Sequence, residues 1–214
     1  MKDIVIVGFG GMGREVACFI DMINKKEPTW NFLGFYDDDP SFVGKEGFCG
    51  TLDDLNKVDK PTGVVIAVGK PATRKAVVER LNGKNLYFPN IISPDCCFFK
   101  EDDYKIGKGN IIGVGCLISL NVTIGDFNIL NNHIALGHDV TLGNYNSLMI
   151  GTKICGACNI GDRNYFGVNS TVLQTFYVGN DTMVGTGSVI MKNTRDDSTY
   201  FGNPAICLLK KKEQ

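Results

Sequence analysis

The sequence has neither an excess of charge of one sign nor a long apolar run. Its 214 residues carry 22 Lys and Arg against 23 Asp and Glu, a net charge of −1. This balance argues against a nucleic-acid-binding surface, and the run Lys210–Lys212 is too short to suggest one. No apolar stretch approaches the roughly 18 residues of a membrane span. The start, Met1-Lys2-Asp3-Ile4, lacks a signal peptide's apolar run and cleavage site. We therefore expect a cytoplasmic protein without a membrane span.

What the chain does have is a strict period of six. Large apolar residues occupy every sixth position without an insertion: Ile106, Ile112, Ile118, Ile124, Leu130, Leu136, Leu142, Leu148, Ile154, Ile160, Phe166, Val172, Val178, Val184 and Ile190. Glycine follows many of them: Gly107, Gly113, Gly125, Gly137, Gly143, Gly161, Gly167, Gly179 and Gly185. A helix repeats near 3.6 and a strand near 2, so neither alone produces this period. A coil with three short flat faces does, and hexapeptide repeats of this kind are typical of β-helix solenoids.

A longer period supports this interpretation. Every third hexad begins in a similar way: Ile124-Gly-Asp, Leu142-Gly-Asn, Ile160-Gly-Asp and Val178-Gly-Asn. A recurrence after three hexads is one full turn of a three-sided prism, which predicts roughly five stacked turns.

Eight cysteines are present, and two of them form the motif Cys155-Gly-Ala-Cys158. Within the hexads these two cysteines occupy the second and fifth positions, which here mostly take small residues. Cys96 and Cys97 are neighbours and Cys18, Cys49 and Cys207 are scattered, so none of these has the spacing of a metal site. We predict small thiols that fill space in a reducing compartment, and no metal.

The first ninety residues alternate strands and helices, which predicts a parallel α/β sheet of the Rossmann type. The predicted elements are strand 3–7, helix 14–26, strand 31–36, strand 63–68, helix 72–81 and strand 85–88. Two prolines, Pro89 and Pro94, and the charged run 100–103 separate this part from the first hexad. We place the domain boundary between residues 92 and 93, giving a domain of residues 1–92 and a β-helix domain of residues 93–214.

A glycine turn, Gly8-Phe-Gly10-Gly11-Met-Gly13, joins the first strand to the first helix. Such a turn lets a phosphate approach the helix N-terminus. Asp37-Asp38-Asp39 ends the second strand, where a nucleotide's ribose or base would lie. Ninety residues hold one mononucleotide-binding half, so we predict a single nucleotide-linked ligand rather than NAD. The alternative is a purely architectural α/β cap.

This combination of domains resembles the bacterial sugar O- and N-acetyltransferases. That family includes the sialic acid O-acetyltransferases and the acetyltransferases of UDP-4-amino sugars. The matching segments are Gly8–Val16, Ala67–Arg74, Gly137–Val140, Gly167–Ser170 and Phe201–Ala205. The resemblance implies a left-handed parallel β-helix, a homotrimer and acetyl-CoA as co-substrate. It also implies a nucleotide-sugar acceptor from surface glycan biosynthesis. Two positions depart from the family: Met12 and Ser147 each stand where it has histidine.

Only two histidines are present, His133 and His138. His138 is third in its hexad, near a corner and off the core, and Asp139 follows it. An imidazole can accept a proton near neutral pH, and a carboxylate can orient the ring. The resemblance makes His138 the general base and Asp139 its partner, whereas we expect His133 to pack on the surface.

The resemblance also implies the binding residues. Those for acetyl-CoA are Gly156, whose N–H would meet the thioester oxygen, and Val168, Gly185, Ala205 and Ser147. Those for the acceptor are Gly10, Gly11, Asp37, Asp38 and Gly69.

Other functions compete with this hypothesis. A sialic acid O-acetyltransferase and a non-catalytic trimeric nucleotide-binding scaffold are the nearest alternatives. An acetyltransferase of serine or a plain hexose generally lacks the α/β domain. A γ-class carbonic anhydrase needs three histidine ligands for zinc, and this chain has two histidines in all.

Overall fold

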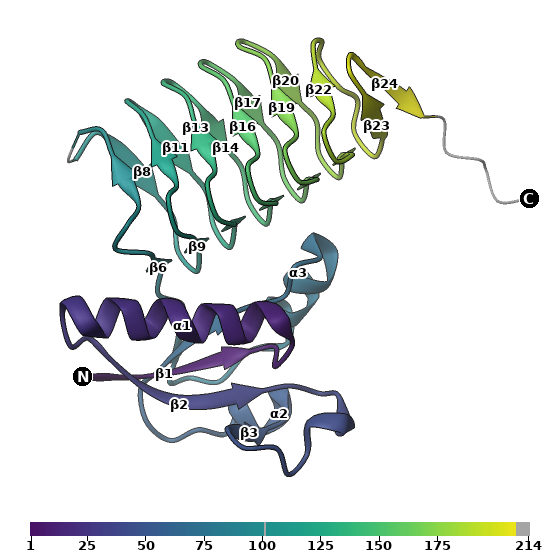
Figure 1. The fold of residues 1–214 in the computed structure, drawn as a ribbon. Helices are drawn as coiled ribbons and strands as arrows, with labels where there is room; N and C mark the ends of the chain where they lie inside the picture. Colours follow the sequence, from purple (N-terminus) through teal and green to yellow (C-terminus); the bar gives the residue numbers. More distant parts are fainter. Residues whose placement is uncertain (101, 209–214) are drawn as a thin grey trace, which may run out of the picture. The chain divides into compact units, whose positions relative to one another are not determined.

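The computed structural model describes residues 1–100 and 102–208, which form two compact units (Figure 1). One unit comprises Met1–Pro94 with Lys108–Ile111, and the other Asp95–Gly107 with the chain from Ile112 onward. The segment 108–111 joins the first unit through backbone hydrogen bonds, from the N–H of Gly109 to the carbonyl of Phe88 and from the N–H of Ile91 to that of Asn110. The boundary between residues 92 and 93 remains our proposal. The Lys210–Lys212 run lies outside the described residues.

The first unit is built on a five-stranded parallel sheet with the strand order β3-β2-β1-β4-β5. The strands are β1 (Lys2–Val7), β2 (Trp30–Tyr36), β3 (Phe48–Gly50), β4 (Thr62–Ile66) and β5 (Leu86–Tyr87). The helical segments are α1 (Gly11–Lys26), α2 (Leu52–Leu55), α3 (Pro71–Arg80) and the 3-10 turn Pro40–Phe42. The predicted strands and helices of this unit are all present, within three residues at each end.

Its core follows from two sequence patterns. The residues of β1 from Ile4 to Val7 and of β4 from Val64 to Ile66 are at most 2% exposed. Central strands of parallel sheets are covered on both faces, so they have continuous apolar runs instead of alternation. Helix α1 buries Val16, Phe19 and Ile20, which lie on one face at helical spacing.

The sequence did not predict β3 and α2. Strand β3 has three residues and α2 has four, too few to show a hydrophobic period. Helix α2 depends on a capping box, in which the Thr51 hydroxyl accepts from the N–H of Asp54 and the Asp54 carboxylate accepts from the N–H of Thr51.

The second unit is a parallel β-helix of short strands in three sheets (Figure 1). One sheet contains β7 (Cys97–Phe98), β10 (Leu117–Ile118), β13 (Ala135–Leu136), β16 (Lys153–Ile154), β19 (Thr171–Val172) and β22 (Val189–Ile190). The next contains β8 (Tyr104–Ile106), β11 (Val122–Ile124), β14 (Thr141–Leu142), β17 (Asn159–Ile160) and β20 (Tyr177–Val178). The last contains β9 (Ile111–Ile112), β12 (Ile129–Leu130), β15 (Ser147–Leu148), β18 (Tyr165–Phe166), β21 (Met183–Val184), β23 (Thr199–Gly202) and β24 (Ala205–Leu208), and its terminal strand, β6 (Ile91–Ile92), belongs to the first unit.

The six-residue repeat of the sequence matches the strand pairing and the burial in the structure. Strands of successive coils pair in parallel, as Leu130 pairs with Leu148 and Leu148 with Phe166, whereas the last strand, β24, pairs antiparallel with β23. The first residues of the hexads from Ile112 to Ile190 are at most 2% exposed and form the core. Ile106, on the terminal strand β8, is only half-buried.

The corners of the prism share one backbone conformation. From residue 109 to residue 187, the fourth position of every hexad has a positive φ, and at Asn121, Asp139 and Ala157 it is 54°, 60° and 57°. The glycines in second position serve another purpose, since a Cβ on Gly137 would lie 2.6 Å from the backbone nitrogen of Gly156. The fourth residue therefore turns the corner, and the second-position glycine lets adjacent coils approach each other.

Two of the three corners differ in their side chains. The ladder corner comprises residues 126–128, 144–146, 162–164 and 180–182. The histidine corner comprises residues 120–122, 138–140, 156–158 and 174–176.

Candidate active site

A row of polar side chains lies on the histidine corner. Nδ1 of His138 is 2.7 Å from Oδ2 of Asp139. The other carboxylate oxygen of Asp139 accepts a 2.7 Å hydrogen bond from the side-chain amide of Asn121, one coil earlier. These bonds lower the pKa of the Asp139 carboxyl, chiefly through Asn121 and next through His138. Asp139 is therefore ionised at neutral pH.

This arrangement sets the tautomer of His138. An ionised carboxylate only accepts hydrogen bonds, so Nδ1 of a neutral imidazole must carry the hydrogen. Nε2 then has its lone pair available, and no hydrogen bond to Nε2 is formed within residues 1–100 and 102–208. The side chain of His138 is 65% exposed. A reactant can thus reach a nitrogen that is able to take a proton.

Gly156 lies directly beside this imidazole. A Cβ at residue 156 would lie 2.6 Å from Nε2 of His138, so the ring has its position only because residue 156 is glycine. The backbone N–H groups of His138 and Gly156 donate no hydrogen bond to the part of the chain that the structure describes. Nε2 and two open N–H donors therefore belong to adjacent coils of one corner.

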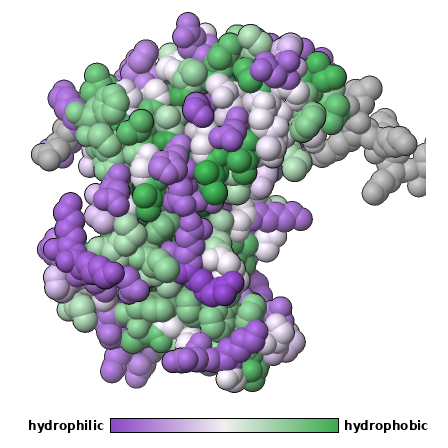
Figure 2. All heavy atoms as spheres, viewed as in Figure 1, coloured by the Kyte–Doolittle hydropathy of each residue, from purple (hydrophilic) through white to green (hydrophobic). Residues whose placement is uncertain are grey.

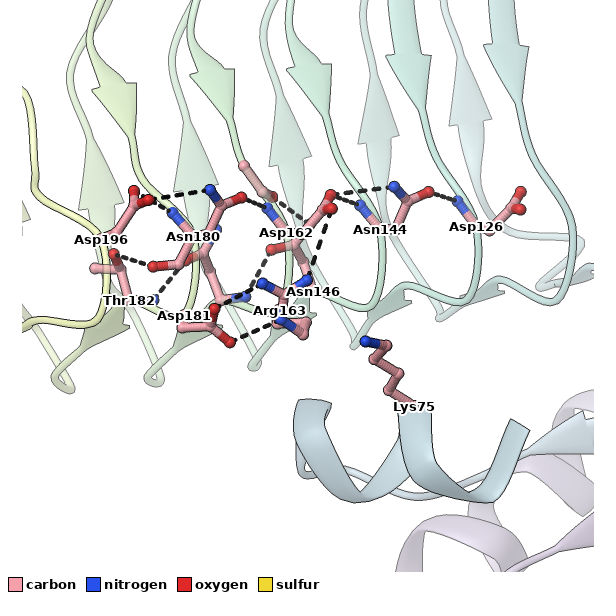
Figure 3. Close-up of polar contacts among 12 residues, drawn as sticks. Lys75, Asp126, Asn144, Asn146, Asp162, Arg163, Asn180, Asp181, Thr182 and Asp196 are labelled. Carbon is pink, nitrogen blue, oxygen red and sulfur yellow. Dashed lines mark hydrogen bonds and ion pairs between the residues drawn. The ribbon is translucent and has the colours of Figure 1, made fainter. Parts of the chain in front are cut away.

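The ladder corner shows the opposite arrangement (Figure 3). There the N–H of Asp126 donates to Oδ1 of Asn144, and that of Asn144 to Oδ1 of Asp162. The ladder continues through Asn180 to Asp196 in the same way. The side chains of this ladder accept hydrogen bonds from backbone N–H groups at the position where the N–H groups of His138 and Gly156 have no acceptor within residues 1–100 and 102–208.

The other predicted donor-binding residues lie elsewhere on the β-helix. Val168 is 38% exposed on the third corner, and Gly167 before it packs closely against Gly185 and Thr186 of the next coil. Ala205 is buried where β24 pairs with β23. Ser147 is fully buried in β15. The structure therefore joins Gly156 to His138, but it does not bring the other four to them.

Two of the five predicted acceptor residues, Asp37 and Asp38, line a cleft within the first unit, whereas Gly10, Gly11 and Gly69 are not part of its lining. This cleft of 340 Å³ lies at the carboxyl ends of β1, β2 and β4, where the strand order reverses. Open α/β sheets bind ligands at such a reversal. Its lining includes Gly8, Asp37, Asp38, Val68, Thr73 and Arg80.

Both acidic residues of the cleft already have partners. The carboxylate of Asp37 accepts from the N–H of Phe9, at 2.8 Å, and from that of Asp39. Asp38 accepts from the N–H of Leu52 and forms an ion pair of 2.6 Å with Arg80. Sequence reasoning missed Arg80, although a cation in the last turn of α3 was a visible signal. Asp37 thus fixes the glycine turn, while Asp38 and Arg80 form one wall of the cleft.

The glycines of the turn divide into two kinds. A Cβ on Gly13 would collide with the carbonyl oxygen of Gly8, so Gly13 serves the close packing of α1 on the sheet. Gly10 and Gly11 are exposed and have open space around them. No side chain caps the N-terminus of α1, which leaves room there for an anion. Gly69 faces the side chain of Met12.

Comparison with known proteins adds to this geometry. A family model described as the PglD N-terminal domain matches residues 3–81. The acetyltransferase domain of PglB from Neisseria gonorrhoeae superposes with a TM-score of 0.88 at 25% identity, over 97% of this chain and 100% of that chain. WeeI from Acinetobacter baumannii gives 0.86 at 26% identity, over 97% and 100%.

These matches support the family predicted from the sequence, the bacterial sugar acetyltransferases with a hexapeptide-repeat fold. The family, the class of enzyme and the fold class predicted from the sequence are thereby confirmed, including the left-handed β-helix. A mutant of perosamine N-acetyltransferase from Caulobacter crescentus, solved with CoA and GDP-perosamine, shares this fold. Its TM-score is 0.87 at 22% identity, over 98% of each chain.

One curated relative of this sugar acetyltransferase belongs to another class. The redox-sensing transcriptional repressor Rex 1 of Thermotoga maritima is 40% identical over 58 residues, which is 27% of this chain. The chain spans about a quarter of that relative, 26% of its length. The two proteins share a segment and not a whole architecture.

The acetyltransferase has no evident metal centre in its described part. Among residues 1–100 and 102–208, no group of three or more His, Cys, Asp or Glu could hold a metal ion. Cys158 is buried and its thiol donates to the carbonyl of Leu173 at 3.0 Å. No helix in the same residues is long and apolar enough to cross a bilayer.

Proposed function

We propose that this chain transfers the acetyl group of acetyl-CoA to an amino group on a nucleotide-linked sugar, with His138 as general base. The observation that carries the proposal is the row on the histidine corner, where Asp139 orients an imidazole whose Nε2 is open. A positioned base of this kind typically contributes about a hundred- to ten-thousandfold in rate.

The chemistry is a direct transfer. The neutral amine attacks the thioester carbonyl carbon, and Nε2 of His138 takes a proton from the amine as the C–N bond forms. The charge on the carbonyl oxygen is stabilised by an N–H donor, for which we propose Gly156. The intermediate then expels the thiolate, and the His138 imidazolium returns the proton to sulfur. Asp139 remains ionised throughout and holds the imidazolium in place.

The donor proposal has independent support. The PglB acetyltransferase domain has also been solved in complex with acetyl coenzyme A. In this chain we assign contacts with acetyl-CoA to Gly156, Val168, Gly185 and Ala205, whereas Ser147, also predicted, is fully buried and presents no surface to a ligand. Open backbone N–H groups at the histidine corner suit the thioester, because they need no side chain to bind it.

The acceptor is assigned to the first unit. Asp37 and Asp38 line the cleft, and Gly10 and Gly11 form the uncapped N-terminus of α1, which suits a phosphate. We assign Gly69, beside Met12, to the same site. The complex of the Caulobacter enzyme with GDP-perosamine supports a nucleoside-diphosphate sugar. Titration calorimetry should detect binding of UDP or GDP that Asp37→Ala weakens, because Asp37 holds the turn at Phe9. Tight binding of NAD without binding of either nucleotide would reverse this assignment.

A homotrimer in the cytoplasm completes the proposal. Large apolar side chains on the β-helix, among them Leu117, Met183, Phe201 and Ile206, are 44–60% exposed. Figure 2 shows hydrophobic residues at the surface of this unit. Burial of such side chains between subunits would favour association. Sedimentation at micromolar concentration should give three chains per particle, and a monomer would contradict both the trimer and any shared donor site.

The decisive assay supplies acetyl-CoA with a panel of acceptors. The panel contains UDP-4-amino sugars, GDP-perosamine, CMP-sialic acid and free sialic acid. Release of the CoA thiol with an amino sugar, and an amide in the product, supports our proposal. Release only with sialic acid would make the chain an O-acetyltransferase. Binding of nucleotide without turnover of any acceptor would favour the non-catalytic scaffold.

A further inference from the structure

Asn121 shares a place with Asp139 on successive coils. It is eighteen residues earlier, at the same hexad position, and it has the same left-handed backbone with φ 54°. Asparagine and aspartate tolerate this conformation better than most residues. The stacking of identical corners therefore aims the Asn121 amide at the carboxylate of Asp139.

We infer that Asn121 is a positioning residue for the proposed acetyl transfer: its amide holds one oxygen of Asp139 so that the other faces Nδ1 of His138. The two bonds, each 2.7 Å long, use different carboxylate oxygens. Without the first bond the carboxylate of Asp139, whose side chain is 51% exposed, could turn toward water. The inference rests on the proposed function for its kinetic consequences but not for its electrostatic ones.

Few charged groups surround this row. The N–H of Asn121 donates to Asp103 at 3.3 Å, and Asp103 lies 4.0 Å from the Lys100 ammonium. The next coil brings the uncharged residues Gly156 and Ala157 and the thiol of Cys155. A change at Asn121 will therefore act on His138 mainly through Asp139.

The first test is kinetic. Asn121→Gly removes the amide without backbone strain, because glycine adopts a positive φ readily. We expect kcat to fall about three- to tenfold, the effect of one hydrogen bond, with KM for acetyl-CoA unchanged. The matched control is His133→Gly, since His133 is also exposed at a fourth position with φ 57°. The control should keep full activity.

A double variant separates positioning from other roles. If Asn121 acts through Asp139, adding Asn121→Gly to Asp139→Gly should slow the enzyme by less than about twofold beyond Asp139→Gly alone. Losses that multiply would show that Asn121 acts independently of Asp139, and would overturn the inference.

The last test needs no turnover. The chain has two histidines, so NMR can follow both imidazoles, and His133→Gly assigns them. Asn121→Asp replaces a hydrogen-bond donor with a second negative charge beside Asp139. This charge should shift the ring resonances of His138 and leave those of His133 in place. Unchanged His138 resonances would overturn the inference, whereas a shift in an enzyme that acetylates no acceptor would refute only the proposed function.

Discussion

The ladder corner and the histidine corner are built on the same backbone but treat its N–H groups in opposite ways. On the ladder corner the third hexad residue is Asp or Asn, and its oxygen accepts the N–H of the coil before (Figure 3). On the histidine corner the third residues are Leu120, His138, Gly156 and Gln174, and none of them accepts such a bond. The side chains of the first corner bond its backbone N–H groups, and those of the second, among the described residues, leave the N–H groups of His138 and Gly156 open.

The fifth hexad residues of the two corners also differ, being polar at one corner and apolar at the other. At the ladder corner the fifth positions are Asn128, Asn146 and Asn164, and the N–H of each later residue donates to the Oδ1 of the one before. At the histidine corner the fifth positions are Val122, Val140 and Cys158, which pack without such bonds. At the ladder corner, both the third and the fifth hexad residues form hydrogen bonds between coils. At the histidine corner, the buried fifth residues stabilise the corner by apolar packing. Changes at the histidine corner should affect activity, and those at the ladder corner stability.

The largest effect is expected from His138→Ala. Loss of the base should lower kcat about a hundred- to ten-thousandfold. Binding of acetyl-CoA, measured by calorimetry, should change little, because the contacts that we propose for the donor are mainly with backbone groups. The melting temperature should also be unchanged, because the side chain is 65% exposed. Retention of most activity, or an acetyl-enzyme that accumulates without acceptor, would rule out the direct mechanism.

Gly156→Asn would give the histidine corner the acceptor that the ladder corner has. An asparagine at position 156 can accept the N–H of His138, as Asn144 accepts that of Asp126. Its Cβ would also displace the imidazole from its position over Gly156. We expect turnover to fall about a hundredfold, comparable to the loss of an oxyanion donor. Gly156→Ala adds only the Cβ, so it should lose less, and equal losses would show that space alone matters.

Asp139→Asn should cost less than either change. The base remains, and only its orientation and the charge beside it weaken, so we expect kcat to fall about tenfold. Since hydrogen bonds lower the pKa of Asp139, this carboxyl should not titrate between about pH 5 and 8 in the wild type. Its ionised form favours the folded state above the ordinary carboxyl range, and that contribution is lost as pH falls through the lowered pKa. A pH–rate profile of the wild type with no carboxyl titration above pH 5 would agree with an Asp139 that is ionised throughout the working range.

Asp162→Ala should reverse the pattern, with a loss of stability and normal turnover. Oδ1 of Asp162 accepts both the backbone N–H and the side-chain amide of Asn144, at 2.7 and 3.1 Å. Losing these bonds should lower the free energy of unfolding by about 1–2 kcal/mol. Thermal unfolding should show the change, and Asp162→Asn should restore most of it because it keeps the accepting oxygen. A large drop in kcat with Asp162→Ala would show that the corners are not separate.

Most of the fold could be predicted because one period repeats through the coil. Each hexad begins with a residue that must be buried, so Ile112 and Ile190 face the core for the same reason. Strand β3 and helix α2 could not be predicted, because they depend on glycines and on a capping box instead of a period.

The site could be predicted in part. His138 and Asp139 are adjacent in sequence, and the structure joins them. Asn121 and Arg80 were missed because their partners, Asp139 and Asp38, are distant in the chain. The eighteen-residue coil contains a signal for Asn121, since it falls one coil before Asp139. The signal for Arg80 is weaker: it is a cation in the last turn of α3, and its pairing with Asp38 after β2 follows no period.

The smallest effect is expected from the double variant Cys155→Ala with Cys158→Ala, which tests whether the histidine corner holds a metal. Burial raises the pKa of the Cys158 thiol, so it stays protonated and is a poor metal ligand. Its thiol donates to the carbonyl of Leu173, a bond whose loss should cost about 1 kcal/mol of stability. Turnover should stay within about twofold of the wild type, since neither thiol takes part in the transfer proposed for His138. Metal content measured by plasma mass spectrometry should be the same in both proteins. Zinc bound one-to-one in the wild type and lost in the variant would show that the motif ligates a metal. The histidine corner would then differ from the ladder corner in a bound metal as well as in its open N–H groups.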